Sequence, residues 1–386
     1  MRILFLAPQP FFEVRGTPLA VLHLVRALSA LGHQVDLLTF PRGEAHPIEG
    51  VRHLRSLNLP VGRVKAGASF AKMALDVPFV AEAAVRLAFG KYDVVHAVEE
   101  AAHLIAPFAR LLRVPLVMDV DSSIPDQLRY SGFATRGPLL GLVELLEGRA
   151  LRSSAAVVTV CASLTEGVKR QAGDVPVFQI EDPPLAEREK LPTDVVAVKQ
   201  DLGLSDRPVV LYSGNFESYQ GVEMLVDASS RVPEAQFLFM GGEPAEIERL
   251  RERARALGSD DRCVFSGKRP PSELPRFLAV TEVLVSPRTR GENTPFKVFT
   301  YLASGKPLVA TRIPSHTQLL SDDTAILVEP TPEGLAGGIR GALQDPAEAR
   351  TRADRGQALI QREYSAARHR EKVAAAYAAV EKLARS

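Results

Sequence analysis

The chain has 386 residues, which is too long for a single hydrophobic core of typical size and favours two similar domains. Apolar residues make up 46% and charged residues 24%, as in soluble globular proteins, and the net charge of +1 gives no general attraction for nucleic acid. The apolar run after Arg2 is too short for a signal peptide, and no stretch has the length of a membrane span. We therefore expect a cytoplasmic protein. Its two cysteines, Cys161 and Cys263, lack metal-ligand spacing and should be buried thiols.

Strand-like apolar runs alternate with helical periodicity along the whole chain, which is typical of an α/β protein with parallel sheets. In the first half we predict strands at 3–7, 35–40, 51–54, 94–96, 116–118, 156–160 and 177–180. The charged, proline-bearing stretch 183–200 is predicted to be a domain linker. In the second half we predict strands at 209–212, 236–240, 263–265, 283–285, 307–310 and 325–328. An amphipathic helix over 366–385 ends the chain.

A loop follows the first predicted strand and precedes a helix. It contains Arg15, Gly16 and Thr17, with Pro18 at the first helical position. Gly16 would let a phosphate or a sugar approach the backbone closely, or would only relax a tight turn. The fingerprint Gly-x-Gly-x-x-Gly is absent, so binding of NAD is disfavoured.

Polar residues also end the fourth and fifth strands. His96 is followed by Glu99 and Glu100, with His103 one helical turn further on, and His96 is a catalytic candidate or a strand-end residue satisfied by the backbone. The fifth strand ends in Asp119-Val120-Asp121-Ser122, which has the spacing of an Asp-x-Asp metal motif. A spacing of three residues is not specific for a metal site. We expect these side chains to form the polar lining of a cleft, and a metal site is the alternative.

The stretch from Ser286 to Thr311 is the most informative part of the chain. A buried strand ends there in a polar loop, and a helix follows that we expect to have Thr294 as N-cap and Pro295 at its first position. The backbone amides of Phe296 and Lys297, with the charge of Lys297, would form a pocket for an anion such as a diphosphate. The alternative is a plain crossover between strands. The loop holds four further polar residues, Arg288, Arg290, Glu292 and Asn293.

This stretch resembles retaining glycosyltransferases of the GT-B fold, family four. The shared pattern comprises Glu292, Pro295, Lys297, Tyr301, Gly305 and Pro307. Thr300 stands where the family has a second acid, with seven residues between it and the first. Elsewhere the chain resembles the family at Asp93-Val94-Val95-His96, although Val98 replaces the second histidine, and at Gly214. Asn215 and Gln220 stand where the family has Arg and Lys.

The resemblance implies two Rossmann-like domains whose parallel sheets face a central cleft. It places the acceptor-side domain at 1–182, completed by the helix over 366–386, and the nucleotide-sugar domain at 201–365. It implies transfer of a sugar from a UDP- or GDP-linked donor to an acceptor hydroxyl, with no cofactor and no metal. Catalytic roles fall to Glu292, Lys297, His96 and Glu99, and acceptor contacts to Arg15, Glu100, Asp119, Asp121 and Ser122. Donor contacts fall to Gly16, Thr17, Gly214, Asn215, Gln220, Lys268, Arg288, Asn293, Thr294, Pro295, Phe296 and Thr300.

Two other functions remain open. The neutral residues at 98, 215, 220 and 300 are consistent with a weak or inactive relative that binds a sugar, a nucleotide or a partner protein. A sugar-nucleotide epimerase on the same fold is disfavoured, because no acid and histidine pair is assignable to proton abstraction. The stretch 51–72 carries five cations and no acid, which indicates either a peripheral contact with anionic lipid at the inner face of a membrane or a solvated loop. The acceptor is a glycan, a lipid or a small molecule.

Overall fold

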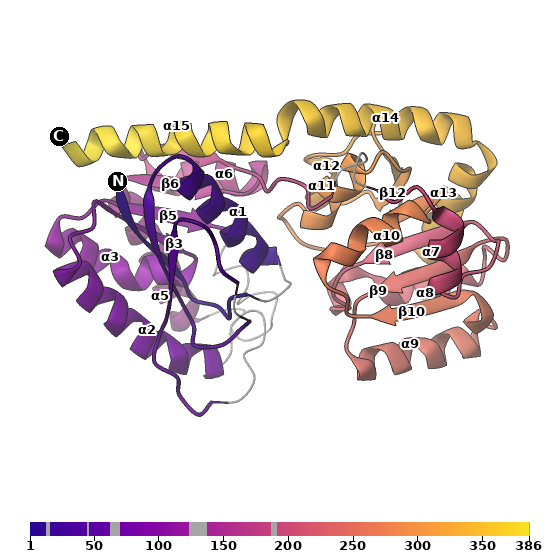
Figure 1. The fold of residues 1–386 in the computed structure, drawn as a ribbon, viewed down its shortest axis with the longest axis horizontal. Helices are drawn as coiled ribbons and strands as arrows, with labels where there is room; N and C mark the ends of the chain where they lie inside the picture. The colour runs from indigo at the N-terminus through magenta and orange to yellow at the C-terminus, as the bar shows by residue number, and fades with distance from the viewer. Residues whose placement is uncertain (13–15, 45, 62–69, 123–136, 187–190, 386) are drawn as a thin grey trace. The chain divides into compact units, whose positions relative to one another are not determined.

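The computed structural model describes residues 1–12, 16–44, 46–61, 70–122, 137–186 and 191–385. It divides into two compact units, Met1–Asp182 with Ala367–Ser386, and Pro183–Ala366. Each unit contains one parallel sheet with helices on both faces (Figure 1). The predicted α/β class with two Rossmann-like parallel sheets is confirmed, since every predicted strand is present.

The first unit is built on a seven-stranded sheet in the order β3-β2-β1-β4-β5-β6-β7. Its strands are β1 (Arg2–Ala7), β2 (Gln34–Thr39), β3 (Val51–Arg55), β4 (Val94–Val98), β5 (Leu116–Val120), β6 (Ala156–Thr159) and β7 (Val177–Gln179). Its helices are α1 (Gly16–Ala30), α2 (Phe70–Phe89), α3 (Glu100–Leu112), α5 (Pro138–Ser153), α6 (Ala162–Ala172) and α15 (Ala366–Arg385). Because all paired strands are parallel, their carboxyl ends meet at one edge of the sheet.

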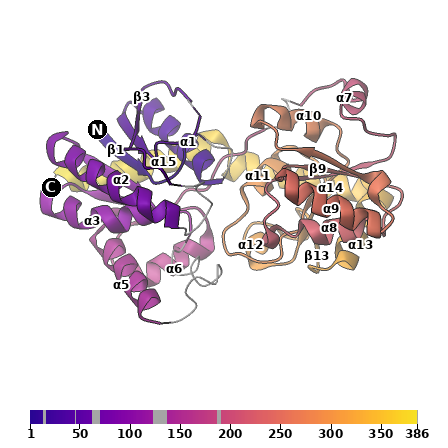
Figure 2. The ribbon, with the colours of Figure 1, turned by 90° about the horizontal axis from the view of Figure 1, so that it is seen from below.

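Alternate residues of each strand face opposite sides of this sheet and so pack on different helices. Leu4 and Leu6 of β1 join a core with α2, α3, α5 and α6. Phe5 faces the other side, where its ring stacks on His96 at 4.3 Å between centroids. Figure 1 and Figure 2 agree that α15 lies across the face opposite α2 and α3.

The second unit is built on a six-stranded parallel sheet in the order β10-β9-β8-β11-β12-β13. Its strands are β8 (Val209–Ser213), β9 (Gln236–Met240), β10 (Cys263–Gly267), β11 (Val283–Ser286), β12 (Leu308–Thr311) and β13 (Ile326–Val328). Its α-helices are α7 (Val195–Asp201), α8 (Val222–Ser229), α9 (Pro244–Ala256), α10 (Leu274–Ala279), α11 (Phe296–Ala303), α12 (Pro314–Thr317), α13 (Pro332–Gln344) and α14 (Pro346–Glu363). Short 3₁₀ turns lie at Ser218–Gln220, Asp260–Arg262 and Pro271–Glu273.

The stretch 183–200, predicted as a linker, is part of the second unit. It contains most of α7, which Asp194 caps by accepting a hydrogen bond from the Ala197 amide. Ala186 and Val198 are buried in the core formed by β8, α10, α11 and their neighbours. The prolines of this stretch therefore accompany apolar anchors that hold it to the second sheet.

Candidate functional site

The second unit places the predicted anion pocket where β8 and β11 end and α11 begins. Helix α11 starts at Phe296, and Pro295 occupies the cap position with extended backbone angles. The expectation of Thr294 as N-cap and Pro295 as first helical residue was therefore wrong by one position. Pro295 still fixes the start, because its carbonyl accepts the amide of Val298 at 2.9 Å. The amino end of the helix remains suited to an anion.

Lys297 lies in the first turn of α11 and contacts residues in and after β8. Its ammonium nitrogen lies 3.9 Å from the centre of the Tyr212 ring and donates a hydrogen bond to Gln220 Oε1 at 3.2 Å. The side chain is half-buried. Burial, and then the charge of Arg288, lower the pKa of Lys297 well below its usual value. Among the described residues no carboxylate forms an ion pair with it, so the pocket holds a lysine whose charged form lacks an anionic partner.

Two glycines let the loops of this pocket approach one another. A Cβ on Gly214, whose φ is +142°, would lie 2.8 Å from the Lys297 nitrogen. A Cβ on Gly221, whose φ is +72°, would lie 1.9 Å from the carbonyl oxygen of Pro287. Any side chain at either position would displace Lys297 or the loop after β11. Tyr212 was missed by the sequence reasoning, although its place in a buried strand two residues before a glycine was a usable signal.

Arg288, predicted to bind the donor, is engaged by its own loop. Its Nε donates to the Arg290 carbonyl at 2.9 Å, and its two terminal nitrogens donate to the backbone oxygen and side-chain oxygen of Asn293 at 2.8 and 3.1 Å. The guanidinium also lies over the Tyr219 ring at 5.1 Å. A side chain that is 7% exposed and holds the loop in this way shapes the pocket and supplies a buried positive charge. It is not placed as a ligand to an outer phosphate.

Other predicted donor residues differ in their exposure. Glu292 and Asn215 are exposed, while Asn293 and Thr294 are half-buried. Lys268 forms an exposed ion pair with Glu243 at 2.7 Å, at the amino end of α9, rather than facing Lys297. Phe296 is half-buried at the first turn of α11.

Thr300 does not present its hydroxyl to a ligand. The side chain is 1% exposed, and its oxygen accepts the backbone amide of Leu185 at 3.0 Å. Thr300 was expected to contact the donor, whereas this hydroxyl holds the stretch before α7 against α11. The ring hydroxyl of Tyr301, one residue on, accepts the Ser213 amide at 2.7 Å and ties α11 to the end of β8.

A buried histidine beneath the same loop was also missed. His316 is completely buried, its Nε2 lies 2.8 Å from the Ser286 hydroxyl, and its Nδ1 lies 2.8 Å from the Thr311 carbonyl oxygen. Burial lowers the pKa of His316 to about 4, with the charges of Arg288 and Lys297 acting in the same direction. A neutral imidazole thus joins the ends of β11 and β12 below the pocket.

In the first unit, His96 is enclosed in the core and is not placed to act on a substrate. It is 0% exposed, with Nε2 at 3.1 Å from Asp119 Oδ2 and Nδ1 at 2.8 Å from the Tyr377 hydroxyl of α15. The catalytic role predicted for His96 is contradicted by this enclosure. Its partners are side chains, so it is not satisfied by the backbone either. His96 joins β4, β5 and α15.

Glu99 and Glu100 do lie at the carboxyl edge of the first sheet. Glu99 has a positive φ of 49°, accepts the Ser122 hydroxyl at 2.6 Å, and lies 4.0 Å from the Lys72 nitrogen. Lys72 is 2.6 Å from Glu100. Burial alone would lower the pKa of Lys72, but the charges of Glu100 and Glu99 outweigh it and raise the pKa. Asp76 lies near this group, and burial followed by the charge of Glu100 raises its pKa to about 7.

In the cationic stretch 51–72, Arg52 and Arg55 are exposed and Lys72 is half-buried. Arg52 binds Asp36, Arg55 donates to the carbonyl oxygens of Gly43 and Glu44 at 3.0 Å, and Lys72 pairs with Glu100. Residues 62–69 lie outside the described part. Each of these three cations binds a neighbouring oxygen, and contact of this stretch with anionic lipid stays a prediction.

A second group of acidic side chains lies near Glu99 and comprises Asp119, Asp121 and Asp182. Asp121 is 8% exposed, and burial, followed by the charges of Asp119, Glu99 and Asp182, raises its pKa well above the usual value, although Thr17 donates a hydrogen bond to it. Burial and the charge of Asp119 raise the pKa of Asp182 to about 8. Thr17 was predicted to contact the sugar donor. In the structure its hydroxyl donates a hydrogen bond to Asp121.

The remaining predictions for the first unit concern the loop before α1, metal ions and membranes. Helix α1 begins at Gly16, two residues before Pro18, which was expected to be its first residue, and Arg15 lies outside the described residues. No group of three or more His, Cys, Asp or Glu side chains arranged to hold a metal ion occurs in the described part of the chain. Within that same part, no helix combines the length and the apolar character needed to cross a membrane.

Curated proteins similar to this chain include two sugar transferases. Alpha-D-kanosaminyltransferase of Streptomyces kanamyceticus is 28% identical over 257 residues, which covers 62% of this chain and 64% of that protein. Sulfoquinovosyl transferase SQD2 of Arabidopsis thaliana is 22% identical over 323 residues, which covers 83% of this chain and 61% of that protein. The similarity thus spans less than two thirds of the length of either relative.

Solved structures and family models agree on the fold. Sucrose-phosphate synthase from Thermosynechococcus elongatus superposes with a TM-score of 0.81 at 22% identity over 100% of both chains. HepE of Anabaena, in complex with UDP-glucose, superposes with a TM-score of 0.76 at 19% identity over 98% of this chain and 99% of that one. The family model "Glycosyl transferase 4-like domain" matches residues 15–180, and "Glycosyl transferases group 1" matches residues 207–345. The chain therefore belongs to the group 1 glycosyl transferases and has their GT-B fold.

Proposed function

We propose that this protein is a retaining, metal-independent glycosyltransferase that moves a sugar from a nucleotide-sugar donor to an acceptor hydroxyl. The observation that carries the proposal is the environment of Lys297. Its ammonium nitrogen is held by the Tyr212 ring and Gln220 at the amino end of α11, in surroundings that lower its pKa. Such a site favours an anion that restores the charged form, and the diphosphate of a nucleotide sugar is one.

The reaction follows from this placement. When the bond between the anomeric carbon and the phosphate oxygen breaks, negative charge grows on the departing diphosphate. Lys297 and the first amides of α11 stabilise that charge, and Arg288 adds a buried positive charge behind the loop. The acceptor oxygen bonds to the anomeric carbon, and its proton passes to the departing phosphate oxygen. Glu292, exposed beside the pocket, orients the sugar by its hydroxyls.

The comparisons support the class of donor and leave the acceptor broad. HepE was solved with UDP-glucose, and the two curated relatives carry names of sugar transferases. We therefore place a UDP- or GDP-linked sugar in the second unit as substrate, with no cofactor. Glu99, Glu100, Asp121 and Ser122 at the carboxyl edge of the first sheet contact the acceptor hydroxyls of a glycan, a lipid or a small molecule.

The test is a panel of UDP- and GDP-sugars, with donor cleavage and transfer measured with and without EDTA. Lys297→Ala is expected to weaken nucleoside diphosphate binding and turnover by about 1.5 to 3 kcal/mol, tenfold to over a hundredfold. Glu292→Gln is expected to spare diphosphate affinity and reduce transfer. Loss of activity in EDTA that magnesium restores would reject metal independence. If Lys297→Ala leaves both quantities unchanged, the pocket is wrongly assigned.

A second candidate is a relative that binds a sugar or nucleotide without transferring it. The position of the family's second acid holds Thr300, which is uncharged and whose hydroxyl accepts the Leu185 amide. Asn215 and Gln220 likewise supply no cation. Nucleotide binding that depends on Lys297, with no donor cleavage for any sugar tested, would favour this candidate over the transferase.

A further inference from the structure

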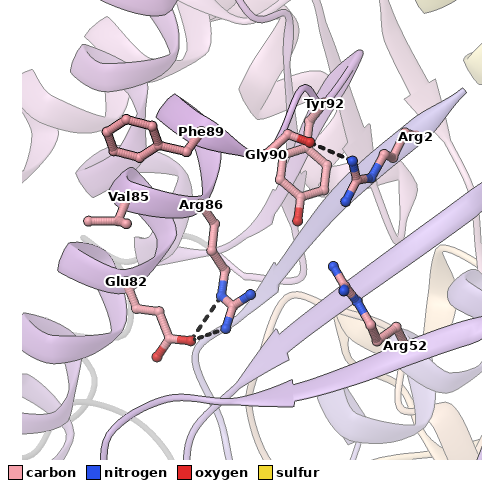
Figure 3. Close-up of a pocket in the computed structure, with 8 residues that line it drawn as sticks. All are labelled: Arg2, Arg52, Glu82, Val85, Arg86, Phe89, Gly90 and Tyr92. Atoms are coloured by element: carbon pink, nitrogen blue, oxygen red, sulfur yellow. Dashed lines mark hydrogen bonds and ion pairs between the residues drawn. The ribbon is translucent and has the colours of Figure 1, made fainter.

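A cavity of about 380 Å³ opens in the first unit, far along the strands from the acidic carboxyl edge. Arg2 is the first residue of β1, Arg52 is the second residue of β3, and Tyr92 precedes β4, so the cavity lies at the amino ends of these strands. Figure 3 shows the guanidinium groups of Arg2, Arg52 and Arg86 around one open space. Glu82, Val85, Phe89 and Gly90 complete its lining.

One buried carboxylate orients two of the three arginines. Asp36 is 7% exposed and accepts Arg52 Nε at 2.8 Å, together with a second bond from Arg52 Nη2. Its Oδ2 also accepts the Tyr92 hydroxyl at 2.5 Å and lies 3.5 Å from Arg2 Nη2. Burial alone would raise the pKa of Asp36, but the bonds from Arg52 and Tyr92 and the nearby charges outweigh it and lower the pKa.

The third arginine and the apolar wall come from α2. Arg86 donates to Glu82 Oε1 from Nε at 2.9 Å and from Nη2 at 2.6 Å, which leaves its Nη1 for another acceptor. Arg52 donates from its Nε and Nη2 to Asp36, which likewise leaves its Nη1 for another acceptor. Val85 and Phe89, on the same helix, are 58% and 83% exposed. The three guanidinium groups face two carboxylates, Asp36 and Glu82, so one positive charge remains.

We propose that this cavity binds a phosphoryl group attached to an apolar body. Three guanidinium groups around one space suit a tetrahedral oxyanion, which presents an oxygen to each, better than a planar carboxylate, which has two oxygens. The exposed Phe89 and Val85 offer a surface for the apolar part of the ligand. The volume is within the range of small-molecule sites. This site is independent of the sugar-transfer site, so it stands or falls separately from the proposed function.

The first arm of the test uses phenyl phosphate, with benzoate as its carboxylate counterpart, in calorimetric titrations of the full chain. Phenyl phosphate is expected to bind more tightly than benzoate, and Arg86→Gln is expected to weaken phenyl phosphate binding about fivefold or more. Arg110→Gln makes the same change at an exposed position of α3 and should have no effect. Lys297→Ala should leave the part of the binding that depends on Arg86 unchanged, since Lys297 lies in the other unit.

The second arm separates a lipid from a soluble ligand. Vesicles of phosphatidylcholine with and without phosphatidate are sedimented with wild type, with Phe89→Ser, and with Leu111→Ser, which removes a side chain that is 79% exposed on α3. Phosphatidate-dependent binding lost in Arg86→Gln and Phe89→Ser assigns the phosphoryl group to a lipid. Arg86-dependent binding of phenyl phosphate without vesicle binding assigns it to a soluble compound. Benzoate binding as tight as phenyl phosphate binding, or no Arg86-dependent binding in either arm, overturns the proposal.

Discussion

The affinity for a nucleoside diphosphate should fall as pH rises, because Lys297 must be charged in the complex. Burial and Arg288 lower the pKa of Lys297 in the free protein, so above that lowered value the side chain is neutral. A bound diphosphate places negative charge beside the nitrogen and raises the pKa again. Between the pKa of the free protein and the pKa of the complex, binding therefore takes up a proton.

The size of the effect follows from the uptake of one proton. Within that pH window the dissociation constant for UDP should rise by up to tenfold per pH unit, or about 1.4 kcal/mol. Below the window Lys297 is charged in both states and the slope is zero. Above pH ~7.5 the terminal phosphate of UDP no longer titrates, since its last pKa is near 6, so the remaining slope belongs to the protein.

The assay is calorimetric titration with UDP in two buffers of different ionisation enthalpy, which counts the protons taken up. Lys297→Met should bind UDP weakly and with no proton uptake from this source. Lys169→Met is the control, because Lys169 lies at an exposed position of α6 in the first unit. Wild-type UDP binding with no proton uptake and no pH slope from neutral to alkaline pH would refute the reasoning.

Three further predictions concern stability. Tyr377→Phe leaves Nδ1 of buried His96 without its partner and should lower the free energy of unfolding by about 1 to 3 kcal/mol in urea titrations, and an unchanged midpoint would contradict the role given to this bond. Thr300→Val should lower the free energy of unfolding by about 1 to 3 kcal/mol, since the Leu185 amide loses its acceptor, and should leave UDP affinity unchanged; weaker UDP binding at unchanged stability would restore the expected donor contact. Asp76, whose pKa is raised from 3.8 to about 7, stabilises the fold most below pH 4, and this contribution is lost as pH rises to 7. In Asp76→Asn that part of the pH dependence of unfolding should vanish, and an unchanged profile would exclude Asp76 as its source.

The fold was predictable because local patterns determine it. Buried parallel strands are short apolar runs, and each run in the sequence became a strand. The start of α11 was misplaced by one residue, since Pro295 fits a cap position as well as a first turn. The stretch 183–200 was misjudged because its prolines were given more weight than Ala186 and Val198, which are buried.

The site was less predictable because side-chain roles depend on partners distant in the sequence. His96 is paired with Tyr377, which lies 281 residues away, and Thr300 is paired with Leu185, 115 residues away. No local spacing reveals such pairs. Lys297 was predicted from its helix start alone to bind an anion, whereas its contact with Tyr212 could be seen only in the fold. Whether it binds a diphosphate stays a prediction.

Gln220 stands where the family has a lysine, and its hydrogen bond with Lys297 explains why a neutral side chain suits this position. A second ammonium there would lie beside the first, whereas the amide oxygen accepts a hydrogen bond from Lys297 at 3.2 Å without cancelling its charge. Gln220→Glu keeps the size and the acceptor but adds a carboxylate, which should raise the pKa of Lys297 in the free protein and repel a diphosphate.

We expect this variant to bind UDP at least about tenfold more weakly, to take up no proton on binding, and to unfold at the same or a higher urea concentration. Gln171→Glu makes the same change in net charge at an exposed position of the first unit and serves as the matched control. If Gln220→Glu binds UDP as tightly as the wild type does, the diphosphate does not lie at Lys297, whatever the outcome of the pH titration.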